Sequence, residues 1–264
     1  MEFSEILWEV DGGVATVTLN RPETRNAITG EAMIADIEAA CAAVNADPSI
    51  KVMILTAADP AFSSGGNVKD MQDGKEMFGG TPAELRDNYK RFIHRIPKAV
   101  TGVAVPTIAA VNGAAVGAGC DLTLMCDMRV ASEKAKFTES FINLGIIPGD
   151  GGAFFLPKLV GMARACEMTF TGKVVKAPEA LEMGLVNYVV PHDRLQAKTR
   201  ELADEIAAKP AHALRMAKQL LYMGQRVALP DLLDQSAAFQ ALCHSTEEHK
   251  ALVREMVEKT SGKK

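Results

Sequence analysis

Two apolar segments, each followed by a glycine-dense loop and then by a helical pattern, constrain the fold of this chain most. The segments are VMILTA at residues 52–57 and PTIAAV at residues 106–111, and both have the composition of buried strands. The loops are FSSGGNVKDM at 62–71 and VNGAAVGAGCDL at 111–122. Because glycine has no Cβ, such loops allow backbone amides to approach a ligand closely. The pattern predicts two strand, loop and helix units whose loops face one site.

One N–H group from each loop could converge on a carbonyl oxygen and form an oxyanion hole. Such donors stabilise the negative charge that develops when the α-carbon loses a proton or a nucleophile is added. Losing one donor typically costs about 3–4 kcal/mol of transition-state stabilisation. The loops therefore favour an enzyme that acts on a carbonyl compound.

The composition is that of a folded globular protein. The chain has 264 residues, of which 48% are hydrophobic and 23% charged, enough for one large domain or a domain with a helical appendix. The net charge of −4 argues against a nucleic-acid or anionic-membrane partner. Five scattered cysteines without C-x-x-C spacing predict free thiols, and we expect a cytoplasmic location. Neither a secretory signal nor a membrane span is expected.

The N-terminal part alternates between strands and helices. Residues 6–20 predict a β-hairpin around Asp11-Gly12-Gly13. A helix is expected from an N-cap at Thr29 to Asp47-Pro48. Residues 73–80 are expected to form a mobile lid. A capping box at 81–84 predicts a long helix that ends before Pro106.

The remainder becomes helical towards its C-terminal third. MRVAS at 128–132 and VNYVV at 186–190 predict strands, and a helix is expected after the glycines of 149–152. From residue 193 to 259 the pattern is helical, broken at Pro210 and Pro230. The sequence thus predicts a β-rich α/β core at 1–192 and a helical region at 193–264.

Several motifs together resemble the crotonase family, also called the enoyl-CoA hydratase/isomerase superfamily. They are NRPETRNAI, FSSGGNVKDM, PTIAAVNGAAVGAGCDLTLMCDMRVAS, AKFTESFINLGIIPGDGG, TFTG with the following A-x-E-A-L-E-M-G-L-V, and TEEHKALVREMVEK. Their order and their spread over nearly the whole chain carry the resemblance. It implies a ββα spiral core that binds an acyl-CoA, a helical C-terminal oligomerisation region, and homotrimers or dimers of trimers. It implies no cofactor besides the coenzyme A of the substrate.

The resemblance also implies which residues bind the thioester. The oxyanion donors would be the backbone N–H groups of Gly66 and Ala118, where the alanine departs from the commoner glycine but keeps the amide if its φ is negative. The N-terminus of the following helix would add partial positive charge. The residues expected to contact the CoA and acyl groups are Arg25, Ala27, Ser64, Asn67, Val68 and Phe141. The alternative for the glycines is a pair of tight turns with no ligand.

Hydration of an unsaturated thioester requires an acid and a base near the β- and α-carbons, and two carboxylates usually supply them in the family. Asp121 stands at the first acidic position; alternatively it only interacts with the helix dipole. The second position is occupied by Phe141, which cannot transfer a proton. Glu139, two residues earlier, would point to the same face of an extended segment and could substitute. Otherwise it is an exposed or ion-paired residue near Lys134 and Lys136.

Asp150 is a third candidate acid or base. It falls where some isomerases and a ring-forming branch of the family place a loop carboxylate, and one base suffices to move a proton between two carbons. Its other role would be the N-cap of the next helix. If it faces the acyl chain, apolar surroundings and nearby Asp121 should raise the pKa of one of the two carboxyls.

The sequence leaves several functions open. Enoyl-CoA hydratase is the first hypothesis, an isomerase that uses Asp150 the second, and a non-catalytic acyl-CoA-binding protein, suggested by Phe141, the third. A dinucleotide-binding oxidoreductase is disfavoured because the glycine spacing at 113–119 is not G-x-G-x-x-G. A serine hydrolase lacks its G-x-S-x-G motif. No metal site is expected, because the histidines have no metal-binding spacing: His94, His192, His212, His244 and His249.

Overall fold

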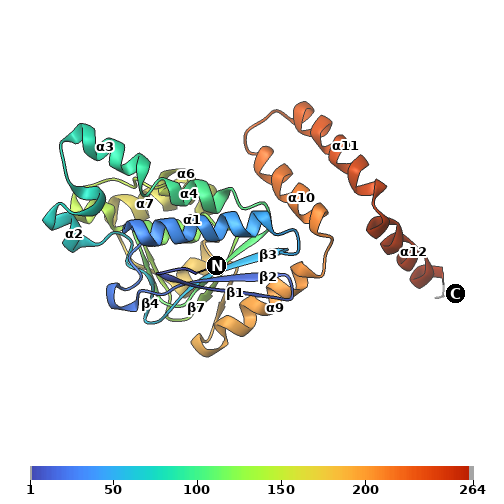
Figure 1. Cartoon of the computed structure of the whole chain (residues 1–264), viewed down its shortest axis with the longest axis horizontal. Coiled ribbons are helices and arrows are strands. Elements are labelled where there is room, and N and C mark those ends of the chain that lie inside the picture. The colour runs from blue at the N-terminus through green and yellow to red at the C-terminus, as the bar shows by residue number, and fades with distance from the viewer. Residues whose placement is uncertain (1, 262–264) are drawn as a thin grey trace. The chain divides into compact units, whose positions relative to one another are not determined.

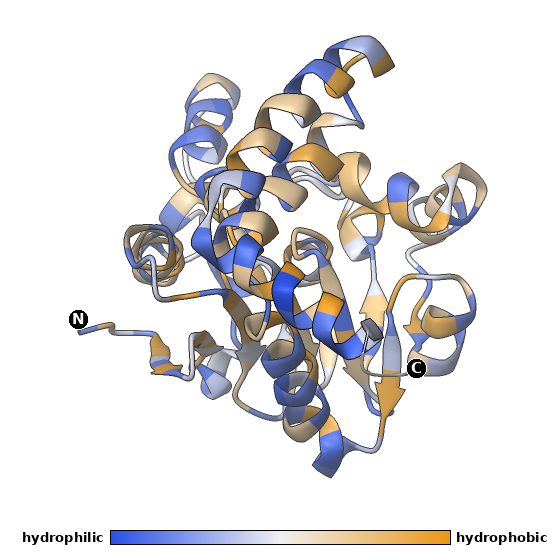
Figure 2. Ribbon diagram, turned by 90° about the vertical axis from the view of Figure 1, so that its right-hand side faces the viewer, coloured by the Kyte–Doolittle hydropathy of each residue, from blue (hydrophilic) through white to orange (hydrophobic). Residues whose placement is uncertain are grey.

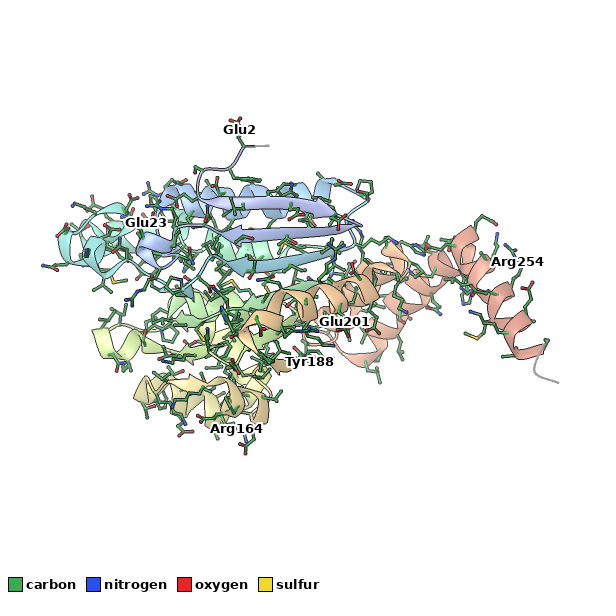
Figure 3. The ribbon with its side chains drawn as sticks, turned by 90° about the horizontal axis from the view of Figure 1, so that it is seen from below. Glu2, Glu23, Arg164, Tyr188, Glu201 and Arg254 are labelled. Carbon is green, nitrogen blue, oxygen red and sulfur yellow. The ribbon has the colours of Figure 1, made fainter. Side chains whose placement is uncertain are left out.

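The computed structural model describes residues 2–261 and divides into two compact units between Ile206 and Ala207. The first unit contains a six-stranded sheet in the order β1-β2-β3-β5-β7-β10, in which only β1 runs antiparallel to its neighbour. Figure 3 shows β1, β2 and β3 side by side. The strands are β1 Ile6–Asp11, β2 Val14–Leu19, β3 Val52–Ala57, β5 Thr107–Val111, β7 Met128–Ser132 and β10 Tyr188–Val190.

A second sheet of four short strands has the order β4-β6-β8-β9. Three times the chain passes from a strand of the first sheet to a strand of the second and then to a helix: β3-β4-α2, β5-β6-α5 and β7-β8-α6. Because β4, β6 and β8 are parallel neighbours, the segments that follow them start from one edge of the sheet. The new elements are β4 Ala61–Ser63, β6 Ala114–Val116, β8 Lys136–Thr138, β9 Val175–Lys176, α2 Val68–Asp73, α5 Ala118–Leu124 and α6 Gly152–Val160.

The other helices of the first unit pack around these sheets. In Figure 1, α1 lies along the sheet with α4 beside it, and the two helices pack together. Arg95 of α4 joins them through ion pairs to Glu31 and Glu38 of α1. These helices and 3-10 turns are η1 Pro22–Thr24, α1 Glu31–Ala46, η2 Glu76–Phe78, α3 Pro82–Arg91, α4 Arg95–Thr101, η3 Ser140–Leu144, α7 Met162–Thr171, α8 Ala177–Glu182, η4 His192–Arg194 and α9 Leu195–Ala207.

Most expected elements are present. The hairpin is β1 and β2, with positive φ at Gly12 and Gly13. All residues of β3 and β5 are buried, and Figure 2 shows the strands in mostly hydrophobic colours against helices of mixed colour. The capping box at Thr81 and Glu84 is formed in both directions. Local hydrophobic and capping patterns were therefore sufficient for these elements.

Two expectations about helices are wrong. The N-cap of α1 is Gly30 rather than Thr29, because the hydroxyl of Thr29 instead accepts a hydrogen bond from the Asn67 backbone N–H, at 3.1 Å. The long helix expected up to Pro106 is broken into α3 and α4. At Phe92 the backbone leaves helical geometry, with φ −108° and ψ −99°, and the chain then buries Ile93 and Ile96. Tertiary burial thus overrides a continuous helical pattern.

The break between the compact units falls after the expected boundary at 192/193. Leu195, Thr199 and Ala203 of α9 are buried at four-residue intervals. Gln196 also donates a hydrogen bond to Thr56 of β3, at 3.1 Å, so the first turns of α9 belong to the core. The second unit contains α10 Ala211–Met223, α11 Leu229–Ser245 and α12 Glu247–Ser261, each packed on the next. Between residues 2 and 261 no helix has the length and apolarity that a membrane span requires.

Candidate active site

A cavity of about 30 Å³ lies where the two glycine loops meet. Its walls come from both loops, from α3, from η3 and from the loop before α6. Most of the lining is apolar, and Asp150 is its one ionisable carboxyl among the residues the structure describes. The lining residues are Thr29, Gly66, Met71, Met77, Phe78, Tyr89, Ile93, Ala118, Phe141, Ile146 and Asp150.

The two loops approach each other backbone to backbone. At Gly65, whose φ is 75°, a Cβ would lie 2.3 Å from the carbonyl oxygen of Val116 and 3.0 Å from the nitrogen of Ala118. A side chain at this position would force the loops apart. Glycine is therefore required here by contact between the loops as well as by its positive φ.

Gly66 and Ala118 both line the cavity, one from each loop. Ala118 begins α5, and the positive φ of this turn is taken by Gly117, at 52°, so the negative φ expected for Ala118 is present. Among residues 2–261, the backbone N–H groups of Gly66 and Ala118 donate to no protein acceptor. First-turn N–H groups of a helix have no partner within the helix, which leaves that of Ala118 available.

Three carboxyl groups are buried together beside this cavity. Asp121 and Glu139 are fully buried and Asp150 is 4% exposed. The Asp121 carboxyl interacts with both of the others, and its Oδ2 accepts a hydrogen bond from the Gly152 backbone N–H at 2.9 Å. Of the three, only Asp150 lines the cavity. The order from the cavity inwards is therefore Asp150, Asp121, Glu139.

Burial favours the protonated form of all three carboxyls. It raises the pKa of Asp121 well above its usual range, and the neighbouring Glu139 charge raises it further. Burial likewise raises the pKa of Asp150, with a further contribution from Asp121. The pKa of Glu139 is raised to about 7, again mainly by burial. Burial therefore favours the protonated form of all three carboxyls, and the pKa of Glu139 lies near neutral pH.

The carboxyl oxygens themselves point to shared protons. Oδ1 of Asp121, Oδ1 of Asp150 and both carboxyl oxygens of Glu139 are buried, and within residues 2–261 no fixed N–H or hydroxyl donor reaches them. Unsatisfied buried polar atoms are costly. The thiol of Cys120 interacts with Glu139, and a proton on one of the carboxyls would satisfy an oxygen of its neighbour. Asp121 therefore connects the carboxyl that lines the cavity with Glu139.

The structure decides between the alternatives for two of these residues. Glu139 is neither exposed nor paired with Lys134 or Lys136, so that alternative is wrong. It follows the last residue of β8 and precedes η3, which places it against Asp121. Asp150 is not the N-cap of α6, since Gly151 occupies that position and no side chain caps the helix. Its position in the cavity wall fits the role of a substrate-facing carboxyl.

The residues expected to contact CoA lie on two adjoining loops. The Ser64 backbone N–H donates to the Arg25 carbonyl at 2.8 Å, and Ala27 pairs with Gly65 as a parallel bridge. Asn67 caps α2 by accepting from the Lys69 N–H, and Val68 is 56% exposed. Arg25 is exposed, and Phe141 lines the cavity.

Asn26 holds the first of these loops and was not singled out from the sequence. It is fully buried with a φ of 56°. Its side chain accepts from the Arg21 N–H and donates to the carbonyls of Ala58 and Ala61, each at 2.8 Å. The asparagine between Arg25 and Ala27 could have indicated a tight turn from the sequence, because asparagine tolerates positive φ and forms hydrogen bonds with nearby backbone.

Tyr89 and Ile146 were also missed. Tyr89 lines the cavity from α3, and burial together with the charge of Asp150 raises the pKa of its hydroxyl. Ile146 lines it from the loop after η3. Neither has a sequence signal, because only the packing of α3 against that loop brings them to the site. Between residues 2 and 261, no group of three or more His, Cys, Asp or Glu side chains is arranged to hold a metal ion.

The chain is similar to known enzymes over nearly its whole length. A family model described as enoyl-CoA hydratase/isomerase matches residues 9–263. A short-chain-enoyl-CoA hydratase of Clostridium acetobutylicum is 33% identical over 98% of this chain and 97% of the relative. A 1,2-epoxyphenylacetyl-CoA isomerase of Escherichia coli is 33% identical over 99% of this chain and 97% of the relative.

The fold agrees with these sequence matches. The crystal structure of an enoyl-CoA hydratase from Mycobacterium smegmatis superposes with a TM-score of 0.89 and 32% identity, covering 97% of each chain. This confirms the predicted crotonase-like α/β core with its helical C-terminal region. The chain belongs to the enoyl-CoA hydratase/isomerase family of enzymes.

Proposed function

We propose that this chain is an acyl-CoA enzyme that stabilises a thioester enolate, and that its main reaction is the hydration of an enoyl-CoA. The observation that carries this is one apolar cavity lined by the buried Asp150 and by Gly66 and Ala118, whose N–H groups donate to no acceptor within residues 2–261. Two N–H groups supply an oxyanion hole for the thioester oxygen. The relatives named above support hydration.

Asp150 supplies the proton chemistry in this proposal. When the cluster has lost one proton, Asp121 passes its proton to Glu139 and accepts that of Asp150, which leaves Asp150 ionised. Asp150 then takes a proton from water as the water oxygen bonds to the β-carbon, and the electrons of the double bond move into the enolate held by Gly66 and Ala118. Asp150 returns that proton to the α-carbon, which completes the addition of one water.

Incubation with crotonyl-CoA tests the proposal. We expect the absorbance of the conjugated thioester to fall and the product mass to rise by one water. Asp150→Asn should reduce kcat by about a hundredfold or more, as for the loss of a general acid–base group. Asp70→Asn is the matched control, because Asp70 lies on α2 and outside the cavity lining. Saturable acyl-CoA binding without turnover would instead support a non-catalytic binding protein.

A double-bond isomerase is the second candidate, and one observation favours it. Asp150 is the sole member of the cluster that lines the cavity, and one base can remove a proton from the α-carbon and return it to the γ-carbon. The E. coli relative is named as an isomerase. Conversion of a 3-enoyl-CoA to the 2-enoyl isomer without gain of water would support this candidate.

The substrate would be held through its coenzyme A, and no separate cofactor is proposed. Arg25, Ala27, Ser64, Asn67 and Val68 lie on adjoining loops next to the cavity, which supports a role in CoA binding. If Arg25 contacts a phosphate of CoA, Arg25→Gln should raise KM for crotonyl-CoA but leave KM for the phosphate-free pantetheine thioester unchanged. An equal change in both values would argue against that contact.

We further propose that the enzyme acts as a homotrimer or a dimer of trimers in the cytoplasm. Supporting self-association, the second unit exposes many large apolar side chains, which proteins usually cover in an interface. Within residues 2–261 none of the five cysteines forms a disulfide, which suits a reducing compartment. The exposed apolar side chains of the second unit are Leu221, Leu229, Leu233, Leu242, Leu252, Val253, Met256 and Val257.

A further inference from the structure

A second, larger pocket adjoins the catalytic cavity in the first unit. It has a volume of about 470 Å³, within the range of small-molecule sites. Tyr89 and Ile146 line both spaces, and Gly149 of the larger pocket directly precedes Asp150 of the cavity. The lining residues are Arg86, Tyr89, Lys90, His94, Gly145, Ile146, Ile147 and Gly149.

The pocket lies at the acyl end of the proposed substrate path. Thr29 and Gly66, which adjoin the loops proposed to hold CoA, line the cavity but not the larger pocket. A thioester oxygen at Gly66 and Ala118, with CoA on the side of those loops, leaves the opposite wall for the acyl chain. That wall is formed by Tyr89 and Ile146, beyond which the larger pocket opens.

The charge of this pocket is unusual for an acidic chain. Arg86, Tyr89 and Lys90 share one face of α3 because they are three and four residues apart. No aspartate or glutamate lines the pocket, although the chain carries a net charge of −4. Within residues 2–261, Lys90 forms no ion pair and Arg86 forms only a long one, at 3.9 Å, with the adjacent Asp87.

The other lining groups complete a site for a chain with a charged end. The imidazole of His94 is engaged with the Gly149 carbonyl, 2.7 Å from Nε2, and this bond ties the start of α4 to the loop before α6. Ile146 and Ile147 offer apolar surface for methylene groups. Asp150 lines the smaller cavity and not this pocket, so among residues 2–261 no carboxylate of the lining neutralises the two cations.

We propose that the preferred acyl group ends in a carboxylate, which Arg86 and Lys90 bind in this pocket. The substrate class would be the CoA monothioesters of dicarboxylic acids. This inference rests on the proposed function for the direction of the acyl chain. The same cations could bind another anion of the substrate, a phosphate of CoA, and the experiment below separates these two sources.

Binding of unreactive saturated thioesters tests the inference independently of turnover. Calorimetry would compare adipyl-CoA with hexanoyl-CoA, suberyl-CoA with octanoyl-CoA, and free CoA. We expect the carboxylate-ended thioester of at least one pair to bind about tenfold more tightly, the effect of two partly solvated charge pairs. The preference should decrease as salt is added, because exposed charges are screened.

Variants of α3 then assign the preference to the two cations. The double variant Arg86→Gln/Lys90→Gln should bring the ratio of the two dissociation constants close to one. Arg91→Gln removes one positive charge from the last turn of the same helix but outside the pocket, and it is the control for each single variant, Arg86→Gln and Lys90→Gln; in it the ratio should stay as in the wild type. Arg86→Lys, which keeps the charge, should retain most of the preference.

Two results would overturn the inference. One is a wild-type protein that binds both members of each pair equally. The other is a double variant that loses affinity for hexanoyl-CoA and free CoA as much as for adipyl-CoA, which would assign the cations to the phosphates. Failure of the proposed function is distinct, because it would appear as normal binding of these thioesters without turnover of any enoyl-CoA.

Discussion

Glu139 is the buried carboxyl of the candidate site whose pKa lies near neutral pH, although it does not line the cavity. Its raised pKa of about 7 results from burial, and its carboxyl interacts with Asp121, which in turn interacts with Asp150. We therefore treat Glu139 as a positioning residue that acts through Asp121. Its effect should be visible in the pH dependence of the reaction rather than in substrate binding.

The pH profile of kcat/KM tests this role. If the cluster must lose a proton to act as a base, activity should rise as pH increases through about 7. Glu139→Gln cannot release that proton, so the rise should move to higher pH. A displacement of about one unit would leave about one-fifth of the wild-type activity at pH 7 and about one-tenth at pH 6. Glu133→Gln, an exposed glutamate after β7, is the control, and an unchanged profile in Glu139→Gln would refute the role.

Stability should also depend on pH through the same residue. The pKa of Glu139 is raised from 4.5 when unfolded to about 7 when folded, so the folded state binds more protons between these values. The contribution of Glu139 to the free energy of unfolding should therefore be greatest below pH 4.5. It should fall as pH rises to about 7, by a few kcal/mol at most. Urea unfolding at several pH values should show a shallower fall in Glu139→Gln than in Glu133→Gln.

At the scale of elements, the start of α6 is fixed against α5. The Gly152 backbone N–H bonds to Asp121, and a Cβ on Gly152 would lie 2.2 Å from Oδ1 of Asp121. Asp121 is fully buried, so a shift of its carboxyl would have to displace packed neighbours. Aspartate at position 121, which is shorter than glutamate, is therefore complementary in shape to the glycine that faces it.

Gly152→Ala should separate these two elements. We expect it to lower the free energy of unfolding by about 2 kcal/mol, as for an overpacked core, and to reduce kcat by displacing Asp150. Gly30→Ala is the control, because no atom lies within 4 Å of its added Cβ and its φ is −76°. That variant should keep its activity and lose only about 0.5–1 kcal/mol of stability, because alanine is a poorer N-cap than glycine. A Gly152→Ala enzyme with wild-type kcat would show that the α5–α6 contact does not position the site.

At the scale of the whole molecule, the exposed apolar side chains of α12 bear on assembly. Leu252 and Met256, and likewise Val253 and Val257, are four residues apart and so form one stripe. Their exposed fractions of 46–63% are large for apolar residues of a folded protein. Such a stripe is typical of a helix that packs on another surface.

Sedimentation velocity tests the proposed assembly. We expect the mass of three or six chains for the wild type, and Met256→Lys should shift the population towards smaller species by placing a charge in the stripe. Glu258→Gln changes the net charge by the same amount on the opposite face of α12 and should leave the mass unchanged. A wild-type protein that sediments as a monomer would contradict the proposal.

Much of the fold could be read from local signals. The hairpin turn at Gly12 and Gly13, the apolar runs that form β3 and β5, and the capping box at Thr81 are each marked by residues within a short window of the sequence. The break at Phe92 could not be read in this way, because it depends on what the chain buries next. The same holds for α9, whose first turns pack on the core although its sequence resembles the helices that follow.

Some features of the candidate site could likewise be predicted from the sequence, and others required the tertiary structure. The sequence by itself determined the family, the two glycine loops and the acidic residues available for catalysis, because these are properties of residue type and order. Only the tertiary structure decided that Asp150 faces the cavity, that Asp121 and Glu139 stand behind it, and that Arg86 and Lys90 line a pocket beyond it. Burial and pKa depend on which distant segments surround a side chain, and that arrangement exists only once the sheets and helices have packed.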